Sequence, residues 1–298
     1  AKVCQGVRSR CMAAKLEVPH NNTIRNRVAK LSEELKISRR RGKKIAEQQF
    51  SPIQGEFPGA DFPLAVVQMD HTKLDIILVD DIHRCPIGRP WITLAMDVFS
   101  RVVAGSYVSF DPPGALSTGL CLAHGILPKD AWLARHEIDE EWPLWGFPAK
   151  ILVDNAKEFR GSMLQRACQQ YGIALEWRPV ARPHYGAHIE RLLGTFLQEI
   201  HSLPGTTFSN IQARGEYDSD GQAVMTLSEF ERWLATYIVE VYHRREHSSL
   251  GMSPLDKLKE GIFGTAQSPG SGLPPKIVDE NRLRLDLMPF VERTVQDY

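Results

Sequence analysis

Apolar and polar positions take on a strand-like order from residue 64 onward. Segments 64–78, 91–98 and 102–110 are rich in β-branched and aromatic residues, and only a short junction around Ser100-Arg101 separates the last two. Such a junction predicts a hairpin, so we expect three antiparallel strands in succession. After the break at Pro112-Pro113, residues 114–127 have the apolar spacing of a helix.

Shorter elements alternate in the second half of the chain. Residues 151–153 form an apolar run that ends at Asp154, 162–171 predict a helix and 173–180 predict another strand. Helical stripes follow at 186–201 and 230–242, and Ser253-Pro254 marks the start of a last short helix. The order βββαβαβα predicts an α/β protein with a mixed five-stranded sheet flanked by helices. Residues 128–148 indicate an insertion that adds no core element.

The flanks of this region have a different pattern. Residues 3–15 and 23–35 predict two helices separated by a turn, with Asn21 or Asn22 as the N-cap of the second. Segments 51–63 and 264–276 are rich in Pro and Gly and predict linkers. Residues 281–298 alternate enough to predict a strand of a further β domain that the fragment truncates. We therefore expect a helical segment at 1–50, a linker at 51–63, a core at 64–263, and a linker with that strand at 264–298.

Composition narrows the class of protein. The chain is 43% hydrophobic and 24% charged, as is typical of globular proteins. No apolar stretch approaches the ~18 residues of a membrane span, and the start does not resemble a signal peptide, so we expect a cytoplasmic protein. The five cysteines include no CxxC pair and favour reduced thiols. The chain begins at Ala1, which suggests a fragment of a longer protein.

The net charge of zero conceals an asymmetry. Residues 1–44 contain 13 Lys and Arg against three Glu, so the rest of the chain carries −10. A basic arm beside an acidic domain favours nucleic-acid binding, although a solvated charged helix has the same composition. A helix-turn-helix would read base edges near the start of its second helix and contact phosphates with the basic tail. The residues expected to contact DNA in these ways are Thr23, Arg25, Asn26 and Arg27 on the helix, and Arg39, Arg40, Arg41, Lys43 and Lys44 in the tail.

Three acidic residues suggest the chemistry. Asp70 interrupts an apolar run, Asp154 ends another, and Glu190 follows after 35 intervening residues in the first turn of a predicted helix. Hard cations such as Mg²⁺ prefer carboxylate oxygens, and two such ions about 4 Å apart support phosphoryl transfer. Strand ends are common ligand positions in α/β sheets, which favours Asp154. The spacing alone leaves several alternatives open, namely Asp75, Asp80, Asp81, Asp97 (the strongest of these) and Glu158.

Five blocks in order resemble a known family. They are QMDHTKLDIILVD, WITLAMDVFSRVVAGSYVSF, ILVDNAKEF, RPHYGAHIERLLGTF and HSSLGMSPLDKLKEG. Together they resemble the retroviral-integrase-like DDE transposase core over about residues 64–262. The chain is most similar to bacterial transposases related to phage Mu transposase and to the larger transposase subunit of heteromeric transposons that work with an AAA+ ATPase.

The resemblance implies an RNase H-like fold with Asp70, Asp154 and Glu190 as ligands of two Mg²⁺ ions, which Mn²⁺ can replace. It also implies that residues 1–50 are a DNA-binding segment and that residues 281–298 are the first strand of a truncated C-terminal β-barrel. It implies cleavage at the 3′ ends of transposon DNA and strand transfer into target DNA by a bacterial, nucleoid-associated homo-multimer. An AAA+ ATPase is the expected partner protein. Further DNA-backbone contacts are expected near the acidic residues, at Lys157, Arg178, Arg182, His184 and Arg191.

Two other functions stay open. A non-catalytic DNA-binding or assembly protein could keep this fold as a scaffold, and an RNase H-like nuclease could hydrolyse DNA without joining it. Joined DNA products separate a transposase from both.

Overall fold

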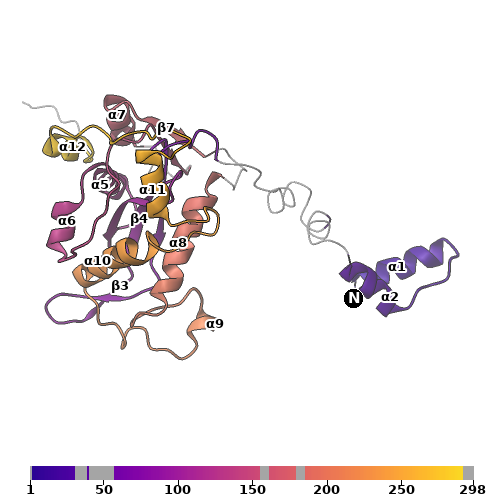
Figure 1. Cartoon of the computed structure of the whole chain (residues 1–298). Helices are drawn as coiled ribbons and strands as arrows, with labels where there is room; N and C mark the ends of the chain where they lie inside the picture. The colour runs from indigo at the N-terminus through magenta and orange to yellow at the C-terminus, as the bar shows by residue number, and fades with distance from the viewer. Residues whose placement is uncertain (1, 31–38, 40–56, 155–160, 179–184, 291–298) are drawn as a thin grey trace, which may run out of the picture. The chain divides into compact units, whose positions relative to one another are not determined.

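The computed structural model describes residues 2–30, 39, 57–154, 161–178 and 185–290 (Figure 1). The chain divides into two compact units. The first comprises residues 1–55 and 181–183, and the second comprises 56–180 and 184–298. None of the described helices is both long enough and apolar enough to cross a membrane.

The first unit contains the two helices that the sequence predicts. Helix α1 spans Lys2–Ala13 and α2 spans Asn21–Ala29, with Ile24 buried between them. The N-cap of α2 is His20, whose Nδ1 accepts a hydrogen bond from Asn22 N at 3.3 Å, so the prediction of an asparagine cap was wrong. The rest of the predicted second helix and most of the basic tail lie outside the described residues.

The second unit is built on a five-stranded mixed sheet. Its strands are β1 (Val66–Lys73), β4 (Trp91–Asp97), β5 (Val103–Ser109), β6 (Lys150–Val153) and β7 (Ala174–Trp177). They lie in the order β5-β4-β1-β6-β7. β1, β4 and β5 pair antiparallel, whereas β6 and β7 pair parallel to β1 and to each other. Strands β2 (Leu78–Val79) and β3 (Pro86–Gly88) form a separate pair.

Helices cover both faces of the sheet. One face packs against α5 (Ala115–Ile126), α7 (Ser162–Gln170), α11 (Pro254–Phe263) and α12 (Glu280–Asp286). The other packs against α8 (Ala187–Ile200), α10 (Leu227–Thr236) and the π-helical turn η3 (Tyr237–Tyr242). The short helix α9 (Ile211–Arg214) lies in the α8–α10 connection. This strand order and layering is the RNase H-like fold, which confirms the predicted fold class.

The predicted insertion at 128–148 is part of the core, contrary to our expectation. It contains helix α6 (Asp130–Arg135), and Leu133, Trp142 and Leu144 are buried. The Trp142 indole donates to the Val103 carbonyl of β5 at 2.6 Å. The polar and acidic residues between these side chains concealed the apolar contacts that fix the segment to the sheet.

The predicted terminal strand was also wrong over residues 280–286. Asp279 caps α12 by accepting from Arg282 N at 2.8 Å. Leu283 and Leu287 are buried while Leu285 is 68% exposed, so the burial follows the helical four-residue spacing rather than alternation. Residues 291–298 lie outside the described part of the chain. The flanking linkers pack in part on the core as well, since Ala60 is buried and Pro274 lies against Gly146.

Candidate active site

Asp70 and Asp154 lie side by side on neighbouring strands, Asp70 within β1 and Asp154 directly after the end of β6. Gln68 of β1 pairs in parallel with Leu152 of β6, so two residues further along Asp70 stands beside Asp154. Adjacent strands are about 4.8 Å apart. The fold therefore brings together two carboxylates from distant parts of the sequence.

Both side chains project toward helix α8. Met69 and Val153 belong to the core cluster on the α5 and α7 face, so the residues that follow them point to the opposite face. Gln68, which has the same orientation as Asp70, accepts a hydrogen bond from Ile189 N in the first turn of α8 at 3.2 Å. Asp70 and Asp154 thus face the helix that carries Glu190.

Arg178 extends this row of charges to a third strand. Val153 pairs with Trp177 of β7, and Arg178 N donates to the Val153 carbonyl at 2.8 Å, so Arg178 stands beside Asp154. Trp177 packs against the core on the α7 face. By alternation the Arg178 side chain turns toward α8, as the two aspartates do.

The Arg178 guanidinium joins two of the three predicted ligands. Nη2 lies 3.1 Å from Asp70 Oδ2, and Nη1 lies 3.2 Å from Glu190 Oε1. The side chains of Arg178 and Asp70 are 12% and 15% exposed, whereas that of Glu190 is 56% exposed. Because charged pairs shielded from water interact more strongly than exposed ones, the Asp70 contact is the firmer of the two.

This arrangement bears on metal binding. Within the described ranges, no group of three or more His, Cys, Asp or Glu side chains is arranged to hold a metal ion. The guanidinium supplies the positive charge that Asp70 and Glu190 would otherwise take from a cation. The donor chemistry of the acids still suits a hard divalent ion, because all three offer carboxylate oxygens.

Gly186 gives the arginine room. A Cβ atom at Gly186 would lie 2.3 Å from Arg178 Nη1 and 2.5 Å from Glu190 Oε1. Such distances require one of these side chains to move. A glycine at the start of α8 therefore permits the Arg178–Glu190 contact.

Gln68 is a positioning residue that the sequence analysis missed. Its side chain is fully buried, with Nε2 donating to the Tyr185 carbonyl at 2.8 Å and Oε1 accepting from Ile189 N. The first N–H groups of a helix have no partner within the helix, so Gln68 satisfies one of them from a different element. These two hydrogen bonds fix the start of α8 to Gln68 of β1, which lies two positions before Asp70. The sequence did contain a signal for this role, because Gln68 is the one polar side chain within the apolar run AVVQM.

Most of the alternative acidic ligands have structural roles. Asp97 is fully buried and accepts from Leu64 N and Ser100 N, both at 2.9 Å, and burial raises the pKa of this carboxyl. Asp75 pairs with Arg89 at 2.6 Å. Asp80 accepts hydrogen bonds from backbone N–H groups of its own loop, and these bonds lower the pKa of Asp80. Asp81 is exposed, and Glu158 lies outside the described residues.

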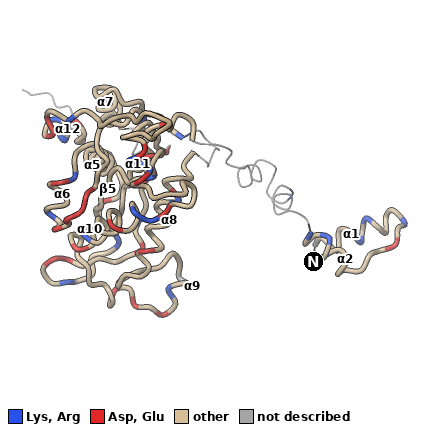
Figure 2. Tube along the Cα trace, viewed as in Figure 1, with Lys and Arg blue, Asp and Glu red and all other residues tan. Residues whose placement is uncertain are grey.

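The predicted DNA contacts fall into three groups. Arg39 is exposed, and so are Thr23, Arg25, Asn26 and Arg27 of α2. Figure 2 marks the Lys and Arg positions of α1 and α2 in blue along the backbone trace. Arg178 is largely buried against the acids, and Arg191 is exposed on α8. The remaining residues lie outside the described part of the chain, namely Arg40, Arg41, Lys43, Lys44, Lys157, Arg182 and His184.

The strand order and the helical layers define an RNase H-like fold, in which Asp70 and Asp154 face α8. Residues 68–205 match the family model described as the TnsB C-terminal domain. Over these residues the chain is similar to that transposase domain, in line with the sequence resemblance.

Two curated relatives agree with this class. The chain is 30% identical over 223 residues to "Transposase for transposon Tn552" of Staphylococcus aureus, covering 74% of this chain and 42% of that protein. It is 30% identical over 169 residues to "Transposon Tn7 transposition protein TnsB" of Escherichia coli, covering 55% and 24%. The chain therefore spans less than half the length of either relative. Among solved structures, the catalytic core domain of BIV integrase aligns with a TM-score of 0.38 and 17% identity, covering 65% of this chain and 93% of that one.

Proposed function

We propose that this chain provides the catalytic core of a DNA transposase, which cleaves 3′ ends of transposon DNA and joins them to target DNA. The observation that carries the proposal is the adjacent placement of Asp70, within β1, and Asp154, directly after β6, both facing α8. The similarity to two transposases supports the same activity.

Asp70, Asp154 and Glu190 are the residues that would hold the divalent cations. Two Mg²⁺ or Mn²⁺ ions bound there would activate the attacking oxygen and stabilise the leaving oxygen of a phosphodiester. Asp70, on the central strand, would contribute one of the carboxylate ligands. In the first reaction the attacking group is water, and the leaving group is the 3′-hydroxyl of the transposon end. In the second, that 3′-hydroxyl forms a bond to the phosphorus of a target phosphodiester, the P–O3′ bond of the target strand breaks, and the target 3′-hydroxyl leaves.

Arg178 offsets part of the negative charge of the site before a cation binds. Its two ion pairs reduce the repulsion between Asp70 and Glu190. For both acids to bind cations, the guanidinium has to release at least one of them. Glu190 is the more exposed partner and the one whose contact breaks first.

The partners follow from the same proposal. Exposed residues of α2, among them Arg25 and Arg27, bind transposon-end DNA together with the basic tail. Joining two ends to one target requires a homo-multimer on DNA, and an AAA+ ATPase is the partner protein. The site of action is the bacterial nucleoid.

The test is strand transfer by the full-length protein with pre-cut transposon-end DNA and Mg²⁺ or Mn²⁺. Asp154→Asn should lower the rate by at least about 100-fold, because it removes a charged oxygen ligand. DNA affinity should change less than about twofold, since no base or backbone contact is removed. Asp81→Asn, an exposed acid outside the row, serves as the matched control. Full activity in Asp154→Asn would refute the site.

Product analysis separates the two other functions. Joined DNA molecules identify a transposase, whereas nicks without joined products identify a nuclease. DNA binding without either product, together with no Mn²⁺ binding in the presence of DNA, identifies a scaffold protein.

A further inference from the structure

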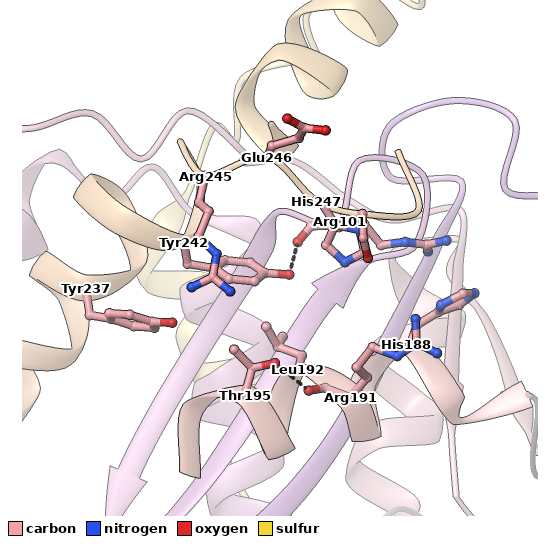
Figure 3. A pocket seen from close by; sticks show the side chains of 11 residues that line it. Arg101, His188, Arg191, Leu192, Thr195, Tyr237, Tyr242, Arg245, Glu246 and His247 are labelled. Carbon is pink, nitrogen blue, oxygen red and sulfur yellow. Dashed lines mark hydrogen bonds between the residues drawn. The ribbon is translucent and has the colours of Figure 1, made fainter. Parts of the chain in front are cut away.

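A second concave site lies on another flank of helix α8. It is a cavity of about 180 Å³ bounded by the β4–β5 turn, α8, η3 and the loop that follows η3 (Figure 3). Arginine side chains enter it from three of these elements. The polar groups that line it include Arg101, Arg191, Thr195, Tyr242, Arg245 and His247.

The cavity carries more positive than negative charge. Glu246 is its only lining carboxylate among the described residues, and Figure 3 shows that side chain turned away from the arginines. Glu199 lies 3.7 Å from Arg245. Neither Arg101 nor Arg191 has an ion pair within the described ranges. Burial lowers the pKa of Arg101, Tyr242 and the buried Asp97 act to raise it, and the charge of Arg191 lowers it to a smaller degree.

Hydrogen bonds hold the walls in place. The Tyr242 hydroxyl donates to the Arg101 carbonyl at 3.0 Å, and the Arg101 guanidinium donates to the Val98 carbonyl. His247 N donates to the Met252 carbonyl at 3.0 Å and closes the loop. Arg101 Nε is buried without a hydrogen-bond partner in the part of the chain that the structure describes. Buried donors are usually satisfied, so this Nε–H group is available to a water or a ligand that enters the cavity.

Size and chemistry select the ligand. Sites for drug-sized molecules measure about 300–1,000 Å³, so this cavity accommodates a single small group. Guanidinium groups bind phosphate oxygens through two parallel hydrogen bonds, and they keep their charge at neutral pH. A phosphate is therefore the anion that this set of donors fits best.

We propose that the cavity binds a backbone phosphate of the DNA strand that is brought to the acidic site. The inference rests on the proposed function for the presence of DNA. Arg191 directly follows Glu190 on α8, so a strand anchored in the cavity passes along the helix that carries the third acid. The anchor fixes the register of the strand relative to Asp70 and Asp154, and it carries no base specificity.

The test measures DNA affinity of the full chain as a function of salt. Arg191→Gln and Arg245→Gln should each weaken binding roughly three- to tenfold, and each should lower the slope of log affinity against log salt by about 0.9. The double variant should lose little more slope than either single one, because both arginines contact one phosphate. Arg244→Gln is the matched control, since Arg244 is adjacent in sequence, pairs with Glu140 and does not line the cavity.

A phosphate scan identifies the contact. Duplexes that carry one neutral methylphosphonate at successive positions should reveal one position at which the wild type loses affinity and Arg191→Gln does not. If DNA binds but Arg191→Gln behaves as Arg244→Gln, the inference is wrong and the proposed function stands. If the chain binds no DNA, both fail. If inorganic phosphate or a mononucleotide binds the cavity while every methylphosphonate duplex binds normally, the occupant is a free phosphate compound and the assignment to DNA is overturned.

Discussion

Helix α8 exposes charges to two different surroundings. On one flank Arg178 pairs with both Glu190 and Asp70, so its single positive charge offsets part of their negative charge within the chain. On another flank Arg191 faces Arg101 and has no carboxylate partner among the described residues. A compensated site is stable without a ligand but has to exchange an internal partner to bind one. An uncompensated site lacks that competition and attracts an opposite charge directly.

Lys129 is a third cation in the second unit, and it differs from the arginines of the two α8 flanks. A lysine can lose its proton at moderately alkaline pH, whereas an arginine keeps its charge. Its Nζ is buried and donates to the Gly125 and Leu144 carbonyls, and burial lowers the pKa of Lys129 to about 7. The unfolded chain therefore binds a proton that the folded chain lacks between pH 7 and about 10.5, so the free energy of unfolding rises with pH in this window.

We expect this rise to be about 3 kcal/mol from pH 7 to pH 10 and to be missing in Lys129→Met. Urea denaturation at both pH values measures it as the difference between wild type and variant, which cancels other titrating groups. Lys259→Met, at an exposed position, is the control. Parallel curves for wild type and Lys129→Met would show that Lys129 stays charged when folded.

The compensated site can be tested by removing its internal cation. Arg178→Gln should raise the affinity for Mn²⁺ in the absence of DNA by about tenfold, because Asp70 and Glu190 lose a competing charge. Calorimetry or Mn²⁺ electron paramagnetic resonance measures the affinity. Arg232→Gln removes an exposed arginine from a different ion pair and should have no effect. Weaker Mn²⁺ binding in Arg178→Gln would instead mean that Arg178 organises the acids for the metal.

Gly186→Ala should also raise the affinity for Mn²⁺, but by less than Arg178→Gln. The added Cβ displaces Arg178 or Glu190 by contact, so their ion pair weakens while both charges remain. Mn²⁺ affinity should rise roughly two- to threefold. Gly194→Ala on the same helix has no atom within 4 Å of the added carbon and should leave the affinity unchanged.

The smallest expected effect is a change in the free energy of unfolding when Arg191 of the uncompensated site is replaced. Arg191→Gln should raise the free energy of unfolding by roughly 0.5 kcal/mol, because it relieves repulsion with Arg101. On the other flank, Arg178→Gln should lower the free energy of unfolding by about 1–3 kcal/mol, because Asp70 loses its ion-pair partner. Urea denaturation at low salt measures both. Equal signs for the two variants would remove the distinction between the two flanks.

Local patterns in the sequence were sufficient for the sheet. Apolar runs at 64–78, 91–98 and 102–110 and the hairpin junction gave the antiparallel strands, since alternation and turn chemistry act over a few residues. They also placed Asp154 at a strand end and Glu190 in the first turn of a helix. The same patterns failed at 280–286. Leu283, Leu285 and Leu287 alternate as in a strand, but Leu283 and Leu287 also have the four-residue spacing of a helix, so the leucines alone do not decide between the two.

Only the tertiary structure decided which charges meet. The parallel register of β1, β6 and β7 set Asp70, Asp154 and Arg178 in one row, and Gly186 left space for the guanidinium to reach Glu190. Likewise, the Trp142 contact that makes 128–148 part of the core joins residues 39 positions apart. The sequence by itself determined which residue types could do the chemistry, because side-chain chemistry is local. Their partners depended on packing between elements distant in the chain, which a one-dimensional pattern does not contain.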